Sequence, residues 1–151
     1  MKSTITPLLL LLLAVFTLNC KNQNKDEAHA NLPTAAVEEP NIQTINLNDG
    51  EKWAVNEEMK PFISDSEKIL NEFIAKKSKD FITLAAQLKE KNSGLVKSCT
   101  MQGASHDELH KWLHPHMKLI ESLANASDLE AASKTIDELK ESFITYNQFF
   151  Q

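Results

Sequence analysis

The apolar residues in the C-terminal part of this chain recur in steps of three and four, and this spacing limits the fold more than any other feature. Steps of three and four place side chains on one face of an α-helix. In the last segment they form a heptad seam over about three repeats, made by Leu129, Ala132, Ile136, Leu139, Phe143, Tyr146 and Phe150. The seam predicts a long amphipathic helix, from Ser127 to the end of the chain, that packs against other helices.

The same period predicts three further helices, at about Glu57–Lys77, Lys79–Lys97 and Ser105–Ala124. Proline belongs in the first turn of a helix, so Pro61 indicates that the first helix begins a few residues after Glu57. Pro115 lies in the second half of the third helix and should kink it.

Serines mark the expected starts of the other helices. Ser78 is the expected N-cap of the second helix. Capping boxes predict the starts of the third and fourth, with Ser105 followed by Glu108 and Ser127 followed by Glu130. Within the second helix, Asn92-Ser93-Gly94 is an expected weak point that frays or bends it.

Four amphipathic helices with short connections predict an all-α fold, an up-down-up-down four-helix bundle over residues 56–151. Residues 42–55 precede it and contain scattered apolar residues and the turn signal Asn48-Asp49-Gly50. We interpret them as an extended arm laid against the bundle. Residues 20–41 are polar, contain Pro33 and Pro40 and have no hydrophobic period, which is typical of a flexible tether.

The first residues have the form of a secretory signal. Lys2 supplies a positive charge, and an apolar run from Pro7 to Phe16 ends shortly before Cys20. Residues 1–20 resemble a bacterial lipoprotein signal peptide with its terminal cysteine, and the resemblance implies that residues 1–19 are removed and that Cys20 is lipidated and anchors the chain to a membrane. The expected location is the bacterial cell envelope, on the periplasmic side of the outer membrane or on the cell surface.

Charge excludes one class of partner. The net charge is −5 and the chain contains no arginine. Without a basic surface or an arginine fork for phosphate, we expect no nucleic-acid binding. If Cys20 carries a lipid, Cys99 has no cysteine partner within the chain and is a free thiol, an intermolecular link or a metal ligand.

Side chains that bind soft and borderline metals are concentrated between Cys99 and Met117. This segment contains four of the five histidines, two of the four methionines and one of the two cysteines. Imidazole, thiolate and thioether groups favour copper and zinc. The topology places the end of the second helix beside the start of the third, so the predicted ligands are Cys99, Met101, His106 and His110.

Other residues of this kind have competing interpretations. Met59, Met117 and His116 are possible additional ligands, although a methionine at helical spacing usually fills a core and His116 falls on the apolar face of its helix. A buried His116 would bond to a backbone carbonyl or to a hydroxyl such as that of Ser66. His114 is turned toward solvent and should contribute little to metal binding.

Enzymatic and haem functions fit the sequence poorly. His106-Asp107-Glu108-Leu109-His110 has aspartate where a zinc protease has its glutamate base. A Cys99–His106 nucleophile pair has no third group to orient it. The architecture resembles cytochrome b562-type bundles, but the last helix has no histidine, which argues against haem. We expect no enzymatic activity.

Residues 47–53 and the Cys99–His110 run resemble a group of small exported bacterial helical proteins, a likeness that implies no activity. Two functions remain open. The chain is either a metal-binding envelope lipoprotein or a lipid-anchored structural or interaction bundle, with an envelope protein as a possible partner.

Overall fold

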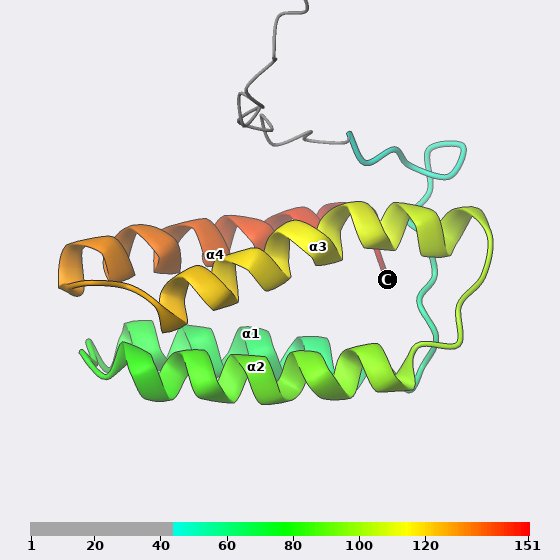
Figure 1. The fold of residues 1–151 in the computed structure, drawn as a ribbon. Coiled ribbons are helices and arrows are strands. Elements are labelled where there is room, and N and C mark those ends of the chain that lie inside the picture. The colour runs from blue at the N-terminus through cyan, green and yellow to red at the C-terminus, as the bar shows by residue number, and fades with distance from the viewer. Residues whose placement is uncertain (1–43) are drawn as a thin grey trace, which may run out of the picture. The chain divides into compact units, whose positions relative to one another are not determined.

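The computed structural model describes residues 44–151, which form four α-helices. The helices run alternately up and down (Figure 1) and are α1 (Lys60–Ala75), α2 (Phe81–Ser98), α3 (Ala104–Ala124) and α4 (Leu129–Phe149). The predicted all-α four-helix bundle is confirmed. The predicted signal peptide, Cys20 and the tether lie outside the described residues. None of the helices in residues 44–151 combines the length and the apolar character that crossing a bilayer requires.

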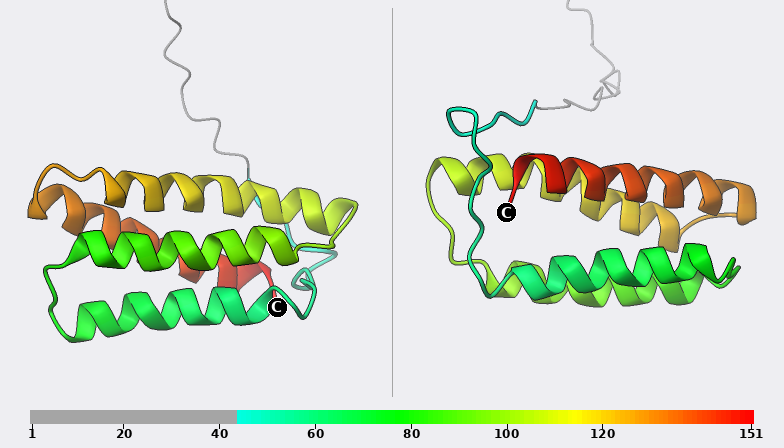
Figure 2. Two further views of the ribbon diagram at one scale, coloured as in Figure 1. Left: turned by 60° about the horizontal axis from the view of Figure 1, so that its bottom comes forward. Right: turned by 180° about the vertical axis from the view of Figure 1, so that it is seen from behind.

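The bundle consists of two helical hairpins. α1 packs mainly against α2 and α3 against α4, while the packing of α2 on α3 joins the hairpins. Figures 1 and 2 show the two hairpins as two layers. The start of α1, the end of α2, the start of α3 and the end of α4 all lie at one end of the bundle. This is the end at which we expected the metal ligands.

Nearly inaccessible side chains fill the space between the layers. The α4 seam contributes Leu139, Phe143 and Phe150, each at most 2% exposed. Leu129, the first residue of α4, is 49% exposed and therefore does not belong to the buried seam. Burial of aromatic and leucine side chains is the main favourable contribution to folding, at about 1.5–3 kcal/mol for each.

Two helices begin with an aspartate cap instead of the predicted serine. The carboxylates of Asp80 and Asp128 each accept a hydrogen bond from the backbone N–H three residues later, at 3.1 and 2.9 Å. Ser78 and Ser127 bond to these aspartates and not to the helix ends. A carboxylate satisfies the free N–H groups and also matches the positive end of the helix dipole, which explains why it displaces the hydroxyl.

The start of α1 agrees with the position of Pro61, whereas the start of α3 differs from the prediction. α1 begins at Lys60, three residues after Glu57, with Pro61 in its first turn. α3 follows Gly103, whose φ of 68° favours glycine, and it has no side-chain cap. The predicted capping box of Ser105 and Glu108 is therefore wrong, because the Glu108 carboxylate bonds to other groups.

The expected weak point in α2 is instead a packing contact. The helix runs unbroken through Asn92 and Gly94. A Cβ atom at Gly94 would overlap the ring of Phe62 on α1. Glycine therefore lets α1 and α2 approach closely at this position. α3 is also unbroken and includes Pro115 within its length.

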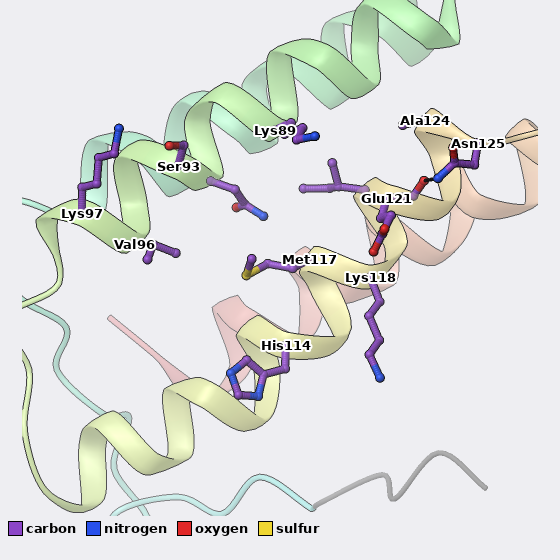
Figure 3. A pocket seen from close by; sticks show the side chains of 12 residues that line it. Lys89, Ser93, Val96, Lys97, His114, Met117, Lys118, Glu121, Ala124 and Asn125 are labelled. Atoms are coloured by element: carbon purple, nitrogen blue, oxygen red, sulfur yellow. Dashed lines mark hydrogen bonds between the residues drawn. The ribbon is translucent and has the colours of Figure 1, made fainter. Parts of the chain in front are cut away.

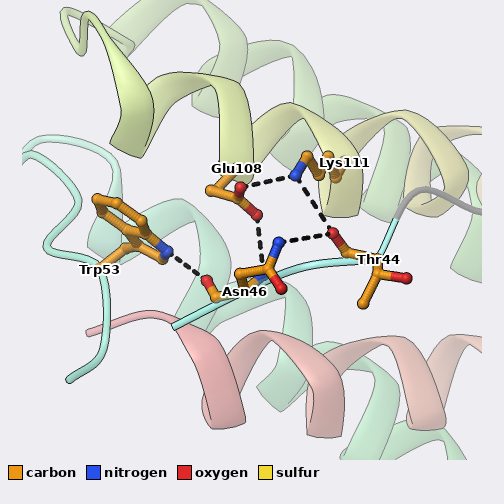
Figure 4. A network of polar contacts seen from close by, with 5 residues as sticks. All are labelled: Thr44, Asn46, Trp53, Glu108 and Lys111. Carbon is orange, nitrogen blue, oxygen red and sulfur yellow. Dashed lines mark hydrogen bonds and ion pairs between the residues drawn. The ribbon is translucent and has the colours of Figure 1, made fainter. Parts of the chain in front are cut away.

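The arm is held by a side-chain network on α3 (Figure 4). The Glu108 carboxylate accepts hydrogen bonds from the backbone N–H of Asn46 (3.0 Å) and from Lys111 Nζ (2.6 Å). Lys111 Nζ also donates to the carbonyl oxygen of Thr44 (3.2 Å), and Trp53 Nε1 donates to that of Asn46 (2.6 Å). These contacts confirm that the arm lies against the bundle.

The arm contains the predicted turn and then pairs with the end of the chain. Asn48 and Glu51 form the turn bridge, with φ of 51° at Asp49 and 93° at Gly50. Further along, the N–H of Trp53 donates to the carbonyl oxygen of Phe149, and the N–H of Gln151 donates back to that of Trp53. The arm and the C-terminal residues are thus tied together.

Candidate metal centre

Three histidines on the first half of α3 form a continuous row, which we call the imidazole ladder (His106, His110 and His114). The Nε2 atoms of His106 and His110 are 3.0 Å apart, and His110 Nδ1 is 2.9 Å from His114 Nε2. Residues four apart lie on one face of a helix, which explains the row. The rings meet edge to face, with centroid separations of 4.3 and 4.7 Å.

The middle member of the ladder has an unusual protonation requirement. Partial burial, together with the neighbouring His106 and His114, lowers the pKa of His110, against an opposing effect of Asp107. A neutral imidazole carries one N–H. His110 must therefore donate to one neighbour and accept from the other. The ladder is a directional hydrogen-bonded chain when it is neutral.

The network that holds the arm also fixes this part of α3. Burial raises the pKa of Glu108, but its hydrogen bonds from Lys111 and Asn46 and the charge of Lys111 outweigh this effect and leave the pKa below its ordinary value. Glu108 therefore stays ionised at neutral pH. It lies on the turn between His106 and His110 and ties that turn to the arm. No local sequence signal pairs Glu108 with Asn46, and this contact was not predicted.

The structure brings together two of the four predicted ligands. Cys99 ends α2 and Met101 follows in the connection to α3, and both are partly buried against the core. Among residues 44–151, no three or more histidine, cysteine, aspartate or glutamate side chains are arranged to hold one metal ion. His106 and His110 form a two-nitrogen pair. Participation of Cys99 and Met101 stays a prediction.

The three possible additional ligands occupy different environments. Met59 is fully buried and belongs to the hydrophobic core. Met117 is 42% exposed. His116 is fully buried, and its ring stacks on Trp112 at 4.7 Å and meets Phe143 edge to face.

The hydrogen bonding of His116 follows the expected type with a different partner. Its Nδ1 is 2.9 Å from the hydroxyl of Ser142 on α4, so Ser66 is not the partner. Ser66 Oγ donates instead to the carbonyl oxygen of Phe62. Within residues 44–151, His116 Nε2 has no hydrogen-bond partner. Burial lowers the pKa of His116 to about 4, so the ring is neutral at pH 7.

An open groove of about 910 Å³ continues from the ladder along the surface between α2 and α3 (Figure 3). His114 lies at one end of it, beside Val96 and Met117, and Ala124 and Asn125 lie at the other. Sequence reasoning missed this groove, because it depends on how two helices are placed and not on the pattern of either one.

Comparisons of the chain with protein-family profiles, with curated proteins and with solved structures find no match. The resemblances stated from the sequence therefore stay predictions.

Proposed function

We propose that this chain is an envelope lipoprotein that binds copper or zinc through His106 and His110, with Cys99 and Met101 as further ligands. The observation that carries the proposal is the 3.0 Å separation of the two Nε2 atoms. Metal–nitrogen distances of about 2.0–2.1 Å put two ligating nitrogens about 2.9–3.4 Å apart, for bond angles between a right angle and the tetrahedral value. On binding, the hydrogen bond between the two nitrogens is replaced by two metal–nitrogen bonds, and both rings rotate to direct their lone pairs at the ion.

His114 has a supporting role in this proposal. Binding at the two Nε2 atoms requires the proton of His110 to be on Nδ1. His114 Nε2 lies 2.9 Å from that atom and accepts its hydrogen bond. Partners of this kind fix the tautomer and the ring orientation of a metal-bound histidine. His114 is exposed, as predicted. Its contact with His110 gives it a positioning role in this proposal, in place of the small contribution predicted from the sequence.

The chemistry of the neighbouring groups favours copper and zinc. Together with two imidazoles, the thiolate of Cys99 and the thioether of Met101 would form a soft to borderline donor set. The lowered pKa of His110 keeps its ring neutral near pH 7, which is the form that binds a metal. Binding should weaken as the solution is acidified, because protons then compete with the metal for the imidazole nitrogens.

Titration calorimetry with Zn(II), and with Cu(I) under reducing conditions, tests the proposal. His106→Ala and His110→Ala should each weaken binding strongly, and His114→Ala should weaken it about 10–100-fold. His29→Ala, which removes the only histidine outside the Cys99–Met117 segment, is the matched control and should bind as wild type does. Affinity no tighter than about 1 μM for both metals, or an unaffected His106/His110 double variant, contradicts the proposal.

The membrane anchor is tested separately. If Cys20 is the lipidated first residue of the mature chain, mass spectrometry of the native protein should find a diacylated or triacylated N-terminal cysteine. Cys20→Ser should release the protein from membranes, and Cys99→Ser should not. Cleavage at another residue, or an unmodified Cys20, excludes the anchor and leaves the metal centre to be judged by the titration.

The second candidate function is a lipid-anchored interaction bundle without a metal. The open groove between α2 and α3 is the observation that favours it, because a bundle that serves only as a spacer needs no hollow surface.

A further inference from the structure

The groove between α2 and α3 combines apolar side chains with positive charge. Val96 and Met117 are 47% and 42% exposed, and Ile120 is buried beneath them. Single exposed apolar residues are ordinary on a protein surface. Here they gather in one hollow, and a flexible methionine is a side chain that adapts to a bound partner.

The charge of the groove is opposite in sign to that of the whole chain. Lys89, Lys97 and Lys118 line it and Glu121 is its only acid, although the net charge of the chain is −5. None of these three lysines forms an ion pair with a carboxylate among residues 44–151, where other lysines do so five times. Unpaired lysines around an apolar hollow favour an acidic partner.

One polar side chain of the groove lacks a hydrogen-bond partner. Asn92 of α2 lines the groove and is only 6% exposed. The side-chain hydrogen bonds found within residues 44–151 do not include its amide. Buried amides are normally satisfied. The Asn92 amide still reaches the solvent of the groove, since His116 Nε2 is the one fully enclosed polar side-chain atom without a partner among residues 44–151, and it is therefore available to a bound molecule.

The length of the groove matches that of a short helix. Its walls are helical stripes, and the α3 wall from His114 to Asn125 is about 16 Å long, which equals about three helical turns. Figure 3 shows Lys97 near one end of the groove, Lys89 near the other and Met117 between the two walls. An amphipathic helix could place its apolar side chains on Met117 and Val96 and its flanking carboxylates near the lysines.

We propose that the α2–α3 groove is a docking site for a short acidic amphipathic helix of another protein. The apolar stripe of the partner lies on Val96, Met117 and Ile120. Its carboxylates pair with Lys89, Lys97 and Lys118. The side-chain amide of Asn92 forms a hydrogen bond with a polar group of the partner. This inference deepens the second candidate function and does not depend on a bound metal. A membrane surface is a poorer fit, because the apolar residues lie in a hollow between two helices.

The test uses the full chain in the presence of a metal chelator, so that its result is separate from that of the metal titration. The probe is a fluorescein-labelled synthetic helical peptide of about 15 residues, with leucines in steps of three and four and glutamates on both sides of that stripe. Fluorescence anisotropy should show binding at low salt. A Lys97→Glu/Lys118→Glu variant should bind at least tenfold more weakly.

Two controls make the result specific. Lys68→Glu/Lys140→Glu makes the same change of charge at exposed lysines outside the groove and should leave the affinity unchanged. A peptide with lysines in place of glutamates should bind the Lys97→Glu/Lys118→Glu variant better than the wild type. Amide chemical shifts of residues in the groove should move on binding, and Met117→Asp should weaken binding of the acidic peptide.

Four outcomes would overturn the inference. They are no measurable binding of the acidic peptide, equal loss of binding in the two charge-reversed variants, self-association of the wild type that buries the groove, and capture of anionic phosphatidylglycerol vesicles by the same lysines in preference to the peptide.

Discussion

His116 shows how a single side chain can make the stability of a bundle depend on pH. Its ring is inaccessible, bonds to Ser142 through Nδ1, and has no partner at Nε2. A protonated ring would need to donate from both nitrogens, and one of these donors would be buried without an acceptor. Burial therefore disfavours the charged form and lowers the pKa of His116 to about 4.

The sign of the pH effect follows from linkage. In the unfolded chain His116 titrates near its ordinary value of about 6.5. Between that pH and about 4 the unfolded state binds a proton that the native state does not, so the free energy of unfolding falls as the pH is lowered. A difference of about 2.5 units corresponds to about 3 kcal/mol.

We expect His116→Leu to remove this contribution. Urea unfolding at several pH values between 7 and 4 should show a shallower loss of stability in the variant than in the wild type. The comparison is needed because carboxylates with lowered pKa values, such as those of Asp80 and Asp128, also weaken the fold as the pH falls. Parallel pH profiles for the two proteins would mean that His116 is hydrated in solution.

At the scale of the element, the helix ends show where sequence patterns mislead. A serine and an aspartate are one or two residues apart before both α2 and α4, and either could cap the helix. Asp128 caps α4, so Asp128→Ala should lower the free energy of unfolding by about 1 kcal/mol. Ser127→Ala, which leaves the cap intact, is the matched control. Thermal unfolding measures both, and the reverse ranking would restore the serine cap.

Gly94 supports a second prediction at this scale. Glycine within a helix usually costs about 1 kcal/mol relative to alanine, so a replacement by alanine would normally stabilise α2. Here the added Cβ would overlap the Phe62 ring. We expect Gly94→Ala to destabilise the protein by about 1–3 kcal/mol in chemical denaturation. Ser93→Ala, at the exposed neighbouring position, should have a small effect. A stabilised Gly94→Ala variant would show that α1 can move away without cost.

The number of helices, their order and most of their buried faces could be predicted, because apolar spacing is a local property of each segment. The row of His106, His110 and His114 follows from spacing as well, but the hydrogen bond that gives His114 a role depends on ring orientation. The contact of Glu108 with Asn46, the partner of His116 and the α2–α3 groove join segments far apart in sequence. Such contacts cannot be predicted from the spacing of apolar residues within one helix.

At the scale of the whole molecule, the arm and the C-terminus together close one end of the bundle. The N–H of Trp53 donates to Phe149, that of Gln151 to Trp53, and that of Val55 to Gln151, at 2.8 to 3.0 Å. This pairing holds Phe150 with its ring 2% exposed, stacked on Tyr146 at 5.3 Å. The same end carries the start of α3 and therefore the imidazole ladder.

Phe150→Ala tests whether this closure stabilises the fold and the candidate metal centre together. Loss of a buried aromatic ring should lower the free energy of unfolding by about 3–5 kcal/mol, which is a large share of the stability of a domain of this size. Ile144→Ala, on the exposed side of α4, should cost less than about 1 kcal/mol. Urea unfolding measures both changes. Amide hydrogen exchange should show faster opening of the arm and of the first turns of α3 in Phe150→Ala, because Asn46 and Glu108 join these segments. A small loss of stability, or unchanged exchange in the arm, would mean that the C-terminal pairing is peripheral to the bundle and that α3 is positioned by the helices alone.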